Sequence, residues 1–499
     1  MHTSTTETST SPHKTPTPHD TANGQKSSDK HPLFVLILLC SAQFMVVLDF
    51  SIVNVALPAI QQDLGFTTQN LQWIVTAYSL TFGGFLLLGG RIGDLLGRRR
   101  LFTIGLLLFA FASLLGGIAQ SALWLVIARA VQGLGAAIIS PTSFSLITTT
   151  FHEGPERNKA LGVVGAVASS GFAAGALLGG LLTAGPGWRW VLFVNVPVAL
   201  VAIVLTPLFL TETKKEKGQV DVLGAITITV SLVALVYALA QGNVVGWGSP
   251  QTLLLVTVAL LLLGAFVFIE TRVNVPLIRL SIFRLRTLTG ANLIGLFAPG
   301  ALGAMIFITT LYMQKVLGYA PTTTGFAFLP MALVLMIVSN VVSRVVPRFG
   351  VQRLLVVGML IMTVGLLLMT RISVENTFWT TLLPGTLVIA LGIGPSFTVM
   401  AIAATTGISD REQGLASGLL NTMQQVGSGL VLAVVSVVSA IQTAALQHER
   451  GVSAKTALVG GFQYAFLVCA VFALLSALIA LFVLRQSIPT TKSATTAQS

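Results

Sequence analysis

The sequence has few charged residues. Asp, Glu, Lys and Arg account for 9% of the 499 residues, hydrophobic types account for 54%, and the mean hydropathy is +0.88. A soluble protein of this length could not bury that much apolar surface, so the composition excludes a soluble fold and predicts an integral membrane protein. The net charge of +12 does not indicate nucleic-acid binding, because the basic residues are spread over short segments between apolar runs.

Cysteines and nucleotide-binding signatures are also scarce. The two cysteines, Cys40 and Cys469, each lie inside an apolar run, which excludes a disulfide framework and a paired-cysteine metal site. No Gly-Lys dipeptide occurs, so the chain has no P-loop and is not predicted to be an ATP-driven pump. Paired catalytic groups and rings of charge are missing from the apolar runs, which argues against an intramembrane enzyme and against a channel. No metal or other cofactor is predicted.

Fourteen apolar runs are long enough to cross a bilayer, and in lipid such segments must be helical. They lie near residues 33–57, 70–90, 101–119, 122–148, 159–184, 189–210, 221–241, 251–270, 287–314, 323–346, 351–371, 377–405, 413–440 and 460–484. With a cytoplasmic N-terminus, Lys and Arg in inward loops outnumber those in outward loops seventeen to five. This bias predicts a multi-pass protein of the cell membrane with both termini in the cytoplasm.

An internal repeat divides the chain. The segment Gly90–Leu101 aligns without gaps with Ser343–Leu354, and the alignment pairs Gly97 with Gly350. The first copy joins spans 2 and 3 and the second joins spans 10 and 11, which predicts two six-helix bundles with two helices inserted between them. Parallel halves around a central cavity are a transporter architecture. The predicted units are a disordered tail at 1–31, bundles at 32–210 and 276–485, an insertion at 211–275 and a disordered tail at 486–499.

The first copy of this repeat is predicted to be a tight cytoplasmic hairpin. Between Gly90 and Arg100 it carries four arginines, one aspartate and three glycines. Arginines hold such a loop on the cytoplasmic side, and glycines permit close approach to a neighbouring backbone.

Several motifs together resemble the major facilitator superfamily, and within it the fourteen-span drug:proton antiporters. They are Gly90-x-x-x-Asp94-x-x-Gly97-Arg98-Arg99, Leu48–Pro58, Arg129-Ala-Val-Gln132-Gly133-Leu-Gly135, Trp188–Pro197 and Asp221-x-x-Gly224. The resemblance covers residues 33–485 and implies the all-helical major facilitator fold with proton-driven export of drugs. It also implies a conformational switch in which Asp94 and Arg98 brace the two halves, with Gly90, Gly97 and Arg99 completing the loop. The second copy has Pro347 at the position of Asp94, so the switch is expected in the first half alone.

A glycine motif in the fifth span resembles the antiporter motif of this family. Its members are Gly171, Gly175, Gly179 and Gly180, and Ala176 stands where the family has proline. The first three recur every four residues along one helix face. Such a stripe is also typical of ordinary close packing between membrane helices, which is the alternative interpretation.

Asp49 and Arg129 are the only ionisable residues deep within the predicted spans. Each costs roughly 2.5–3.5 kcal/mol at a bilayer centre, so a role is expected for both. Both lie about 10–12 Å below the outer edge of the hydrocarbon, which permits an ion pair. The hypothesis is that Asp49 carries the coupling proton or a substrate cation, with Arg129 as its charge partner. The alternative is a pair that only locks two helices together.

Other polar and aromatic residues are candidates for the cavity by their neighbourhood alone. They are Gln43, Asn54, Trp73, Tyr78, Gln132, Asn421, Gln424 and Gln425. For each of them a packing role or a place at the membrane interface is the competing interpretation.

The favoured function is secondary export of hydrophobic or cationic drugs, driven by the proton motive force. Two alternatives remain open, namely proton-coupled uptake of a nutrient or osmolyte and a transport-inactive receptor on the same scaffold. The expected partners are the small-molecule substrate, protons and membrane lipid, for a monomer that is not an enzyme. In everted vesicles only an antiporter should collapse a preformed pH gradient when drug is added.

Overall fold

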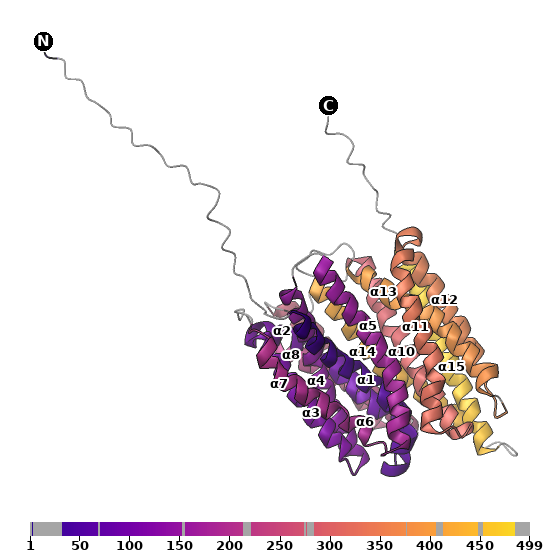
Figure 1. The fold of residues 1–499 in the computed structure, drawn as a ribbon. Coiled ribbons are helices and arrows are strands. Elements are labelled where there is room, and N and C mark those ends of the chain that lie inside the picture. The colour runs from indigo at the N-terminus through magenta and orange to yellow at the C-terminus, as the bar shows by residue number, and fades with distance from the viewer. Residues whose placement is uncertain are drawn as a thin grey trace, which may run out of the picture.

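The computed structural model describes residues 2, 32–67, 70–151, 155–212, 221–273, 276, 284–375, 377–405, 413–447 and 453–484. Within these residues all regular structure is helical, in fourteen rods (Figure 1). The predicted terminal tails fall outside them, apart from His2.

The first eight rods cover the first half and the insertion. Their bounds are α1 Pro32–Leu64, η1 Asn70–Gln72 with α2 Trp73–Leu96, α3 Arg98–Gly117, α4 Ala122–Thr150, α5 Pro155–Ala184, α6 Trp190–Phe193 with α7 Asn195–Phe209, α8 Val222–Val245 and α9 Pro250–Arg272. The remaining six are α10 Arg286–Leu311 with η3 Tyr312–Val316, α11 Pro321–Phe349, α12 Val351–Met369, η4 Phe378–Leu382 with α13 Leu383–Thr405, α14 Gln413–Gln447 and α15 Ala454–Phe482.

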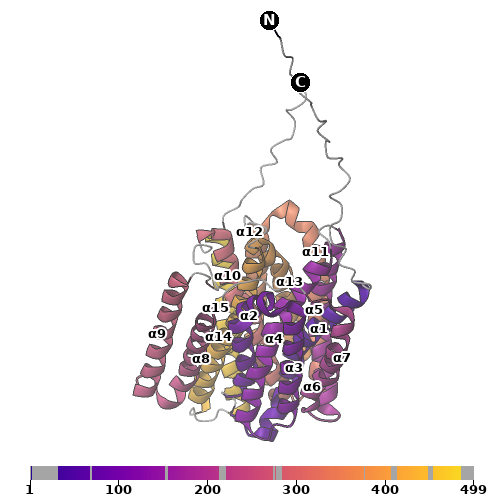
Figure 2. The same ribbon diagram turned by 90° about the vertical axis from the view of Figure 1, so that its left-hand side faces the viewer.

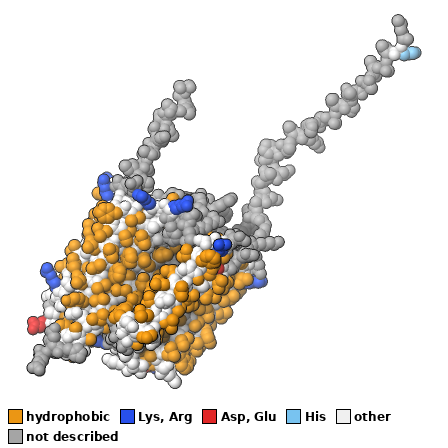
Figure 3. All heavy atoms as spheres, turned by 180° about the vertical axis from the view of Figure 1, so that it is seen from behind, with side chains coloured by type: hydrophobic (Ala, Val, Ile, Leu, Met, Phe, Trp, Pro, Cys, Tyr) orange, Lys and Arg blue, Asp and Glu red, His pale blue; other side chains and the backbone are white. Residues whose placement is uncertain are grey.

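The helices have the length and composition of membrane spans. Among the described residues, 13 helices are long and apolar enough to cross a bilayer, and the short apolar stretch Ala174–Ala184 belongs to α5. That fourteenth helix runs for 30 residues, or about 45 Å. Large apolar side chains face outward, such as Leu261 at 67% exposure and Leu208 at 71%. Figure 3 shows one such face, with Lys and Arg gathered towards its ends. The predicted all-helical membrane fold is confirmed.

Polar residues at helix starts explain several boundaries. The hydroxyl oxygens of Ser121 and Ser453 accept hydrogen bonds from backbone N–H groups in the first turns of α4 and α15. The Asp221 carboxylate accepts one from the Gly224 N–H at 2.7 Å. Such caps satisfy N–H groups that a helix start leaves without partners. The Asp221-x-x-Gly224 motif therefore has a local role as the cap of α8.

Single glycines form the corners of both repeat copies. Gly97 separates α2 from α3 with φ +103°, and Gly350 separates α11 from α12 with φ +77°. The prediction of an eleven-residue loop between Gly90 and Arg100 is wrong in extent, because α2 continues to Leu96 and α3 begins at Arg98. Helices continue past the apolar run because their polar residues can extend towards the membrane surface. The matching corners agree with the alignment of the repeat.

The two halves pack against each other mainly through two pairs of helices. α5 packs on α11, and α2 packs on α14. The inserted helix α8 lies against both α2 and α14, and α9 packs on α8 at the edge of the molecule (Figure 2). α1 begins and α15 ends at the same end of the bundle (Figure 1), which we call the terminal face, and we call the opposite end the distal face. The exact unit boundaries stay a prediction.

Candidate functional site

Asp49 lies in the interior of the first half, with 0% of its side chain exposed. Its Oδ2 accepts a hydrogen bond from Arg129 Nη1 at 2.6 Å, which makes the pair a salt bridge between α1 and α4. Its Oδ1 accepts from Gln132 Nε2 at 2.8 Å and from Asn195 Nδ2 at 2.7 Å. The ion pair that the sequence permits is therefore present. The side-chain amides of Gln132 and Asn195 donate the other hydrogen bonds to the carboxylate.

The Arg129 side chain is equally enclosed, with 1% exposed. Its Nε donates to the Ile74 carbonyl at 3.1 Å, and its Nη1 donates also to Gln132 Oε1 at 2.7 Å. The guanidinium carbon lies 4.4 Å from the centre of the Tyr78 ring, a cation–π distance. Tyr78 is itself fully buried and its hydroxyl donates to the Val46 carbonyl at 3.5 Å. Backbone, amide and aromatic groups together replace the water that the cation has lost.

Five helices meet at this network: α1, α2, α3, α4 and α7. Gln132 links it to α3, because its Nε2 donates to Ser113 Oγ at 2.8 Å. Sequence reasoning did not single out Ser113 or Asn195. Asn195 had a usable signal, since it is a polar residue in the family motif Trp188–Pro197. Ser113 had none, because a serine in an apolar helix commonly bonds only to its own backbone.

The chemistry of the shell fits an ionised carboxylate. Three groups donate to Asp49 and an ionised carboxylate only accepts, so each bond has the right polarity. Removing one member of a buried pair leaves an uncompensated charge and costs about 3–5 kcal/mol. A proton on Asp49 would weaken its bond to Arg129 in the same way. The hydrogen bonds around Asp49 and Arg129 thus join five helices of the first half.

The other candidates of the first half lie apart from one another. Gln43 is buried on α1, and its Oε1 has no partner. Asn54 donates to the Phe50 carbonyl of its own helix at 2.8 Å, so its amide is used locally. Trp73 packs against Tyr237 of α8, with ring centres 6.1 Å apart. Of the five candidates from this half, only Tyr78 and Gln132 join Asp49 and Arg129.

The candidates of α14 point in different directions. The Cβ that a side chain would have at Gly83 of α2 lies 2.9 Å from Gln425 Cβ, so Gln425 faces the first half. The Cβ built at Gly295 of α10 lies 3.6 Å from Gln424 Cγ, so Gln424 faces its own half. Asn421 is half-buried. Successive residues of a helix are about 100° apart, so Gln424 and Gln425 cannot share one surface.

The glycine stripe of α5 lies against α1. A Cβ at Gly171 would come within 3.2 Å of the Phe44 carbonyl oxygen, and one at Gly179 would come within 2.7 Å of the Ile52 oxygen. Gly175 contacts Ser51 and Leu48 in the same way. The stripe therefore serves the close helix packing that the alternative interpretation expects.

Gly180, unlike the other three glycines of the motif, packs against α11 of the second half. A Cβ built at this position would be 2.6 Å from the Pro321 carbonyl oxygen. One turn earlier, the Ala176 carbonyl oxygen lies against Gly325. This side of α5 forms a tight backbone contact between the halves near the distal face.

Comparison with known proteins identifies the family. The sequence profile described as Major Facilitator Superfamily matches residues 39–432. The chain belongs to the major facilitator superfamily.

Relatives and solved structures agree with this membership. The chain is 41% identical to the puromycin resistance protein pur8 of Streptomyces alboniger over 443 residues, which is 88% of each chain. It is 37% identical to the cephamycin export protein CmcT of Amycolatopsis lactamdurans, over 88% of this chain and 91% of that one. A crystal structure of a bacterial homologue of the human lysosomal transporter Spinster shares the fold, with a TM-score of 0.64, 16% identity and coverage of 92% and 98%. The protein is thus a multi-pass membrane transporter and not an enzyme.

The loop motif of this major facilitator protein packs mostly against its own half. Gly90 and Gly93 lie against Pro141 and Thr142 of α4. Arg98 Nη1 donates to the Ser145 carbonyl of α4 at 3.4 Å. The side chain of Asp94 lies outside the described residues, so its role as a brace between the halves stays a prediction.

Glu212, which follows α7, lies at the Gly97 corner between α2 and α3. It was not predicted from the sequence. Its Oε2 lies 3.6 Å from Arg99 Nε and 3.5 Å from Arg100 Nε. Its carboxylate also occupies the space where a Cβ of Gly97 would be. The glycine at position 97 therefore permits both the positive φ and the approach of Glu212.

Proposed function

We propose that the protein exports amphipathic, neutral or cationic antibiotics across the cell membrane in exchange for protons, by alternating access. The observation that carries the proposal is the enclosed Asp49–Arg129 pair within a chain whose relatives include resistance and export proteins for antibiotics. Both termini would lie in the cytoplasm, as the distribution of Lys and Arg predicts. The protein would act as a monomer in the lipid bilayer.

Asp49 would carry the coupling proton. In the present conformation neither Asp49 nor Arg129 contacts solvent, so a proton reaches the carboxyl only after the surrounding helices separate. Protonation would remove the negative charge of Asp49, weaken its bond to the Arg129 guanidinium and leave that cation without its counter-charge. Because α1, α2, α3, α4 and α7 all contribute to the network, this local change would be transmitted to the first half as a whole. Release of the proton would restore the pair and the starting conformation.

The substrate class follows from the charges that the spans contain. Asp49 and Arg129 form an enclosed ion pair within the described spans, and Asp49 is the carboxylate that a cationic substrate would meet once the surrounding helices separate. Relatives named for puromycin and tetracenomycin C favour compounds that have both apolar and polar parts. We therefore propose neutral or singly cationic amphipathic compounds.

Everted membrane vesicles test the proposal directly. Vesicles from a pump-deficient host that expresses the chain are energised, and the internal pH is followed with a quenched dye. Puromycin, a cephamycin, tetracenomycin C and lincomycin, the compounds in the names of four relatives, are then added one at a time. An exporter collapses the pH gradient with at least one of the four, and the Asp49→Asn variant does not. Collapse by the variant at the wild-type rate would remove Asp49 from the coupling mechanism, and no collapse by any compound would overturn the export proposal.

A further inference from the structure

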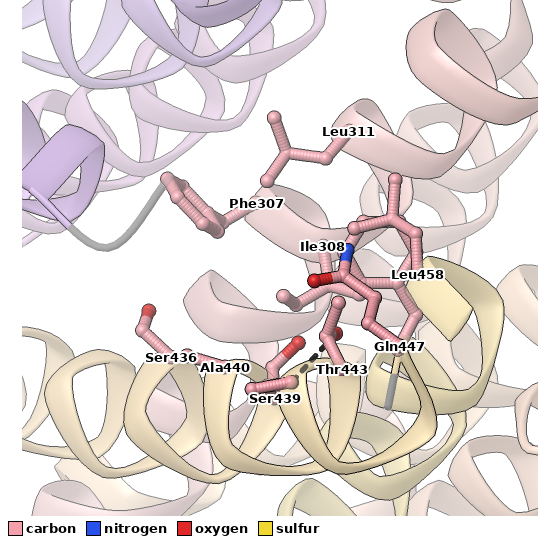
Figure 4. A pocket seen from close by; sticks show the side chains of 11 residues that line it. Phe307, Ile308, Leu311, Ser436, Ser439, Ala440, Thr443, Gln447 and Leu458 are labelled. Carbon is pink, nitrogen blue, oxygen red and sulfur yellow. Dashed lines mark hydrogen bonds between the residues drawn. The ribbon is translucent and has the colours of Figure 1, made fainter. Parts of the chain in front are cut away.

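A cavity of about 250 Å³ lies near the distal face of the second half, away from Asp49 (Figure 4). It is lined by the last turns of α10, the distal third of α14 and the beginning of α15, and it is partly open. Its lining residues are Phe307, Ile308, Leu311, Ser436, Ser439, Ala440, Thr443, Ala444, Gln447, Leu458 and Phe462. None of these residues is charged.

The two walls of the cavity differ in polarity. The α14 wall carries Ser436, Ser439, Thr443 and Gln447, spaced three or four residues apart, so that helical periodicity brings them to one face. The opposite wall is apolar and aromatic, with the Phe307 ring facing the α14 hydroxyls in Figure 4. A ligand that fits both walls is an uncharged amphiphile with an aromatic or aliphatic body and a hydrogen-bonding edge.

One polar group of this wall lacks a partner. Ser436 is 7% exposed and its Oγ makes no hydrogen bond. The Thr443 hydroxyl, in contrast, donates to the Ser439 carbonyl at 2.8 Å. A buried hydroxyl without a partner costs about 1–3 kcal/mol, and a ligand in the cavity would supply the missing bond.

Unpartnered polar atoms also lead from the interior towards this cavity. On α14 they are Thr422 Oγ1 and Gln425 Oε1, and on α2 they are Gln72 Oε1, Thr76 Oγ1 and Ser79 Oγ. The two helices face each other along this line, because Gly83 of α2 meets Gln425 and Gly429 of α14 meets Thr76. From Gln425 to Ser436 the distance along α14 is about 16 Å. The interface between α2 and α14 thus provides hydrogen-bonding groups between the interior of the protein and the distal cavity.

We propose that this distal cavity is a release site, where the uncharged part of the exported compound binds after it leaves the interior and before it leaves the protein. The assignment rests on the proposed export function. The volume is below the roughly 300–1,000 Å³ of a site that encloses a whole drug, so the cavity holds a part of the compound, with Ser436 as its hydrogen-bonding partner. The rest of the compound would extend towards the distal face.

Two substitutions separate filling of the cavity from loss of its hydrogen bond. Ala440→Phe fills the cavity and should lower export of puromycin at least about tenfold, whereas Ser436→Ala should raise the KM for export about fivefold, as expected for one neutral bond. Ser436→Thr keeps the hydroxyl and should stay within about twofold of wild type. Ser428→Ala is the matched control, because Ser428 lies buried on the same helix with its hydroxyl bonded to the Gln424 carbonyl at 2.9 Å.

Protection from alkylation tests occupancy without relying on transport. Ala440→Cys is introduced, and the rate of its reaction with N-ethylmaleimide is measured on purified protein with and without puromycin. Wild type serves as the blank, since Cys40 and Cys469 are buried. Thr456→Cys, at the exposed start of α15 outside the cavity, serves as the control position. Puromycin should slow the reaction at position 440 at least about threefold and leave position 456 unchanged.

The possible outcomes are distinguishable. If wild type exports puromycin but position 440 is not protected and Ala440→Phe transports normally, the release site is wrong and export stands. If position 440 is protected equally by lipid vesicles without drug, the cavity is a lipid site and the assignment is overturned. If wild type exports none of the four compounds, the export proposal fails and the release site fails with it.

Discussion

The Asn195 amide of α7 donates a 2.7 Å hydrogen bond to the Asp49 carboxylate of α1, across 146 positions of sequence. Arg129 binds the other oxygen of the same carboxylate from α4. Asp49 is therefore held from two sides by helices that do not follow one another in the chain. The orientation of the carboxylate, and with it any coupling to protons, depends on both contacts.

Asn195→Ala should loosen this orientation. A hydrogen bond to a charged group contributes about 1.5–3 kcal/mol, so we expect a lower melting temperature and a shifted pH dependence of drug-driven proton release. Asn54→Ala is the matched control, because that buried amide donates only to the Phe50 carbonyl of its own helix. A pH profile that changes equally in both variants would show that Asn195 has no special relation to Asp49.

Comparing Asp49→Asn alone with the Asp49→Asn/Arg129→Gln double variant should separate the effect on stability from the effect on proton coupling. The single substitution leaves a buried guanidinium without its counter-charge and should destabilise the protein by about 3–5 kcal/mol. The double variant removes both charges, so its melting temperature should recover most of the loss while proton exchange stays absent. Exchange at the wild-type rate in the double variant would mean that the pair only joins two helices, as the alternative interpretation of the sequence holds.

Gly97→Ala and Gly350→Ala should differ although the two glycines occupy equivalent corners. Both have positive φ, which costs an alanine about 1 kcal/mol, but a Cβ at 97 also meets the Glu212 carboxylate while a Cβ at 350 has nothing within 4 Å. Gly97→Ala should therefore lower the melting temperature more than Gly350→Ala does. Adding Glu212→Ala to Gly97→Ala should restore part of that difference, and no restoration would contradict the steric explanation.

Gly180→Ala should impair export more than Gly171→Ala. The added methyl group at 180 would lie 2.6 Å from the Pro321 carbonyl oxygen, so α5 and α11 must move apart at the distal face. At position 171 the nearest atom is 3.2 Å away and within the first half, where a small shift of α1 suffices. Initial rates of puromycin export in vesicles, normalised to the amount of protein, measure the difference. Equal rates in the two variants would show that the distal contact does not limit transport.

The sequence by itself determined the membrane fold. Apolar runs of about 20 residues leave the backbone no polar partner but itself, so the spans had to be helices. It also permitted an ion pair between Asp49 and Arg129, because both charges lie at a similar depth and isolated charges in a bilayer are costly. The corner glycines could be matched as Gly97 and Gly350 from a gapless alignment alone.

The tertiary structure decided which side chains meet. Ser113 joins the Asp49 network, whereas Trp73 packs against the inserted helix α8, and nothing in their local sequence separates these two cases. Gln424 and Gln425 are neighbours in the chain and face different halves. The physical reason is that helical periodicity fixes the direction in which each side chain points, but only the packing of distant helices decides which groups lie in that direction.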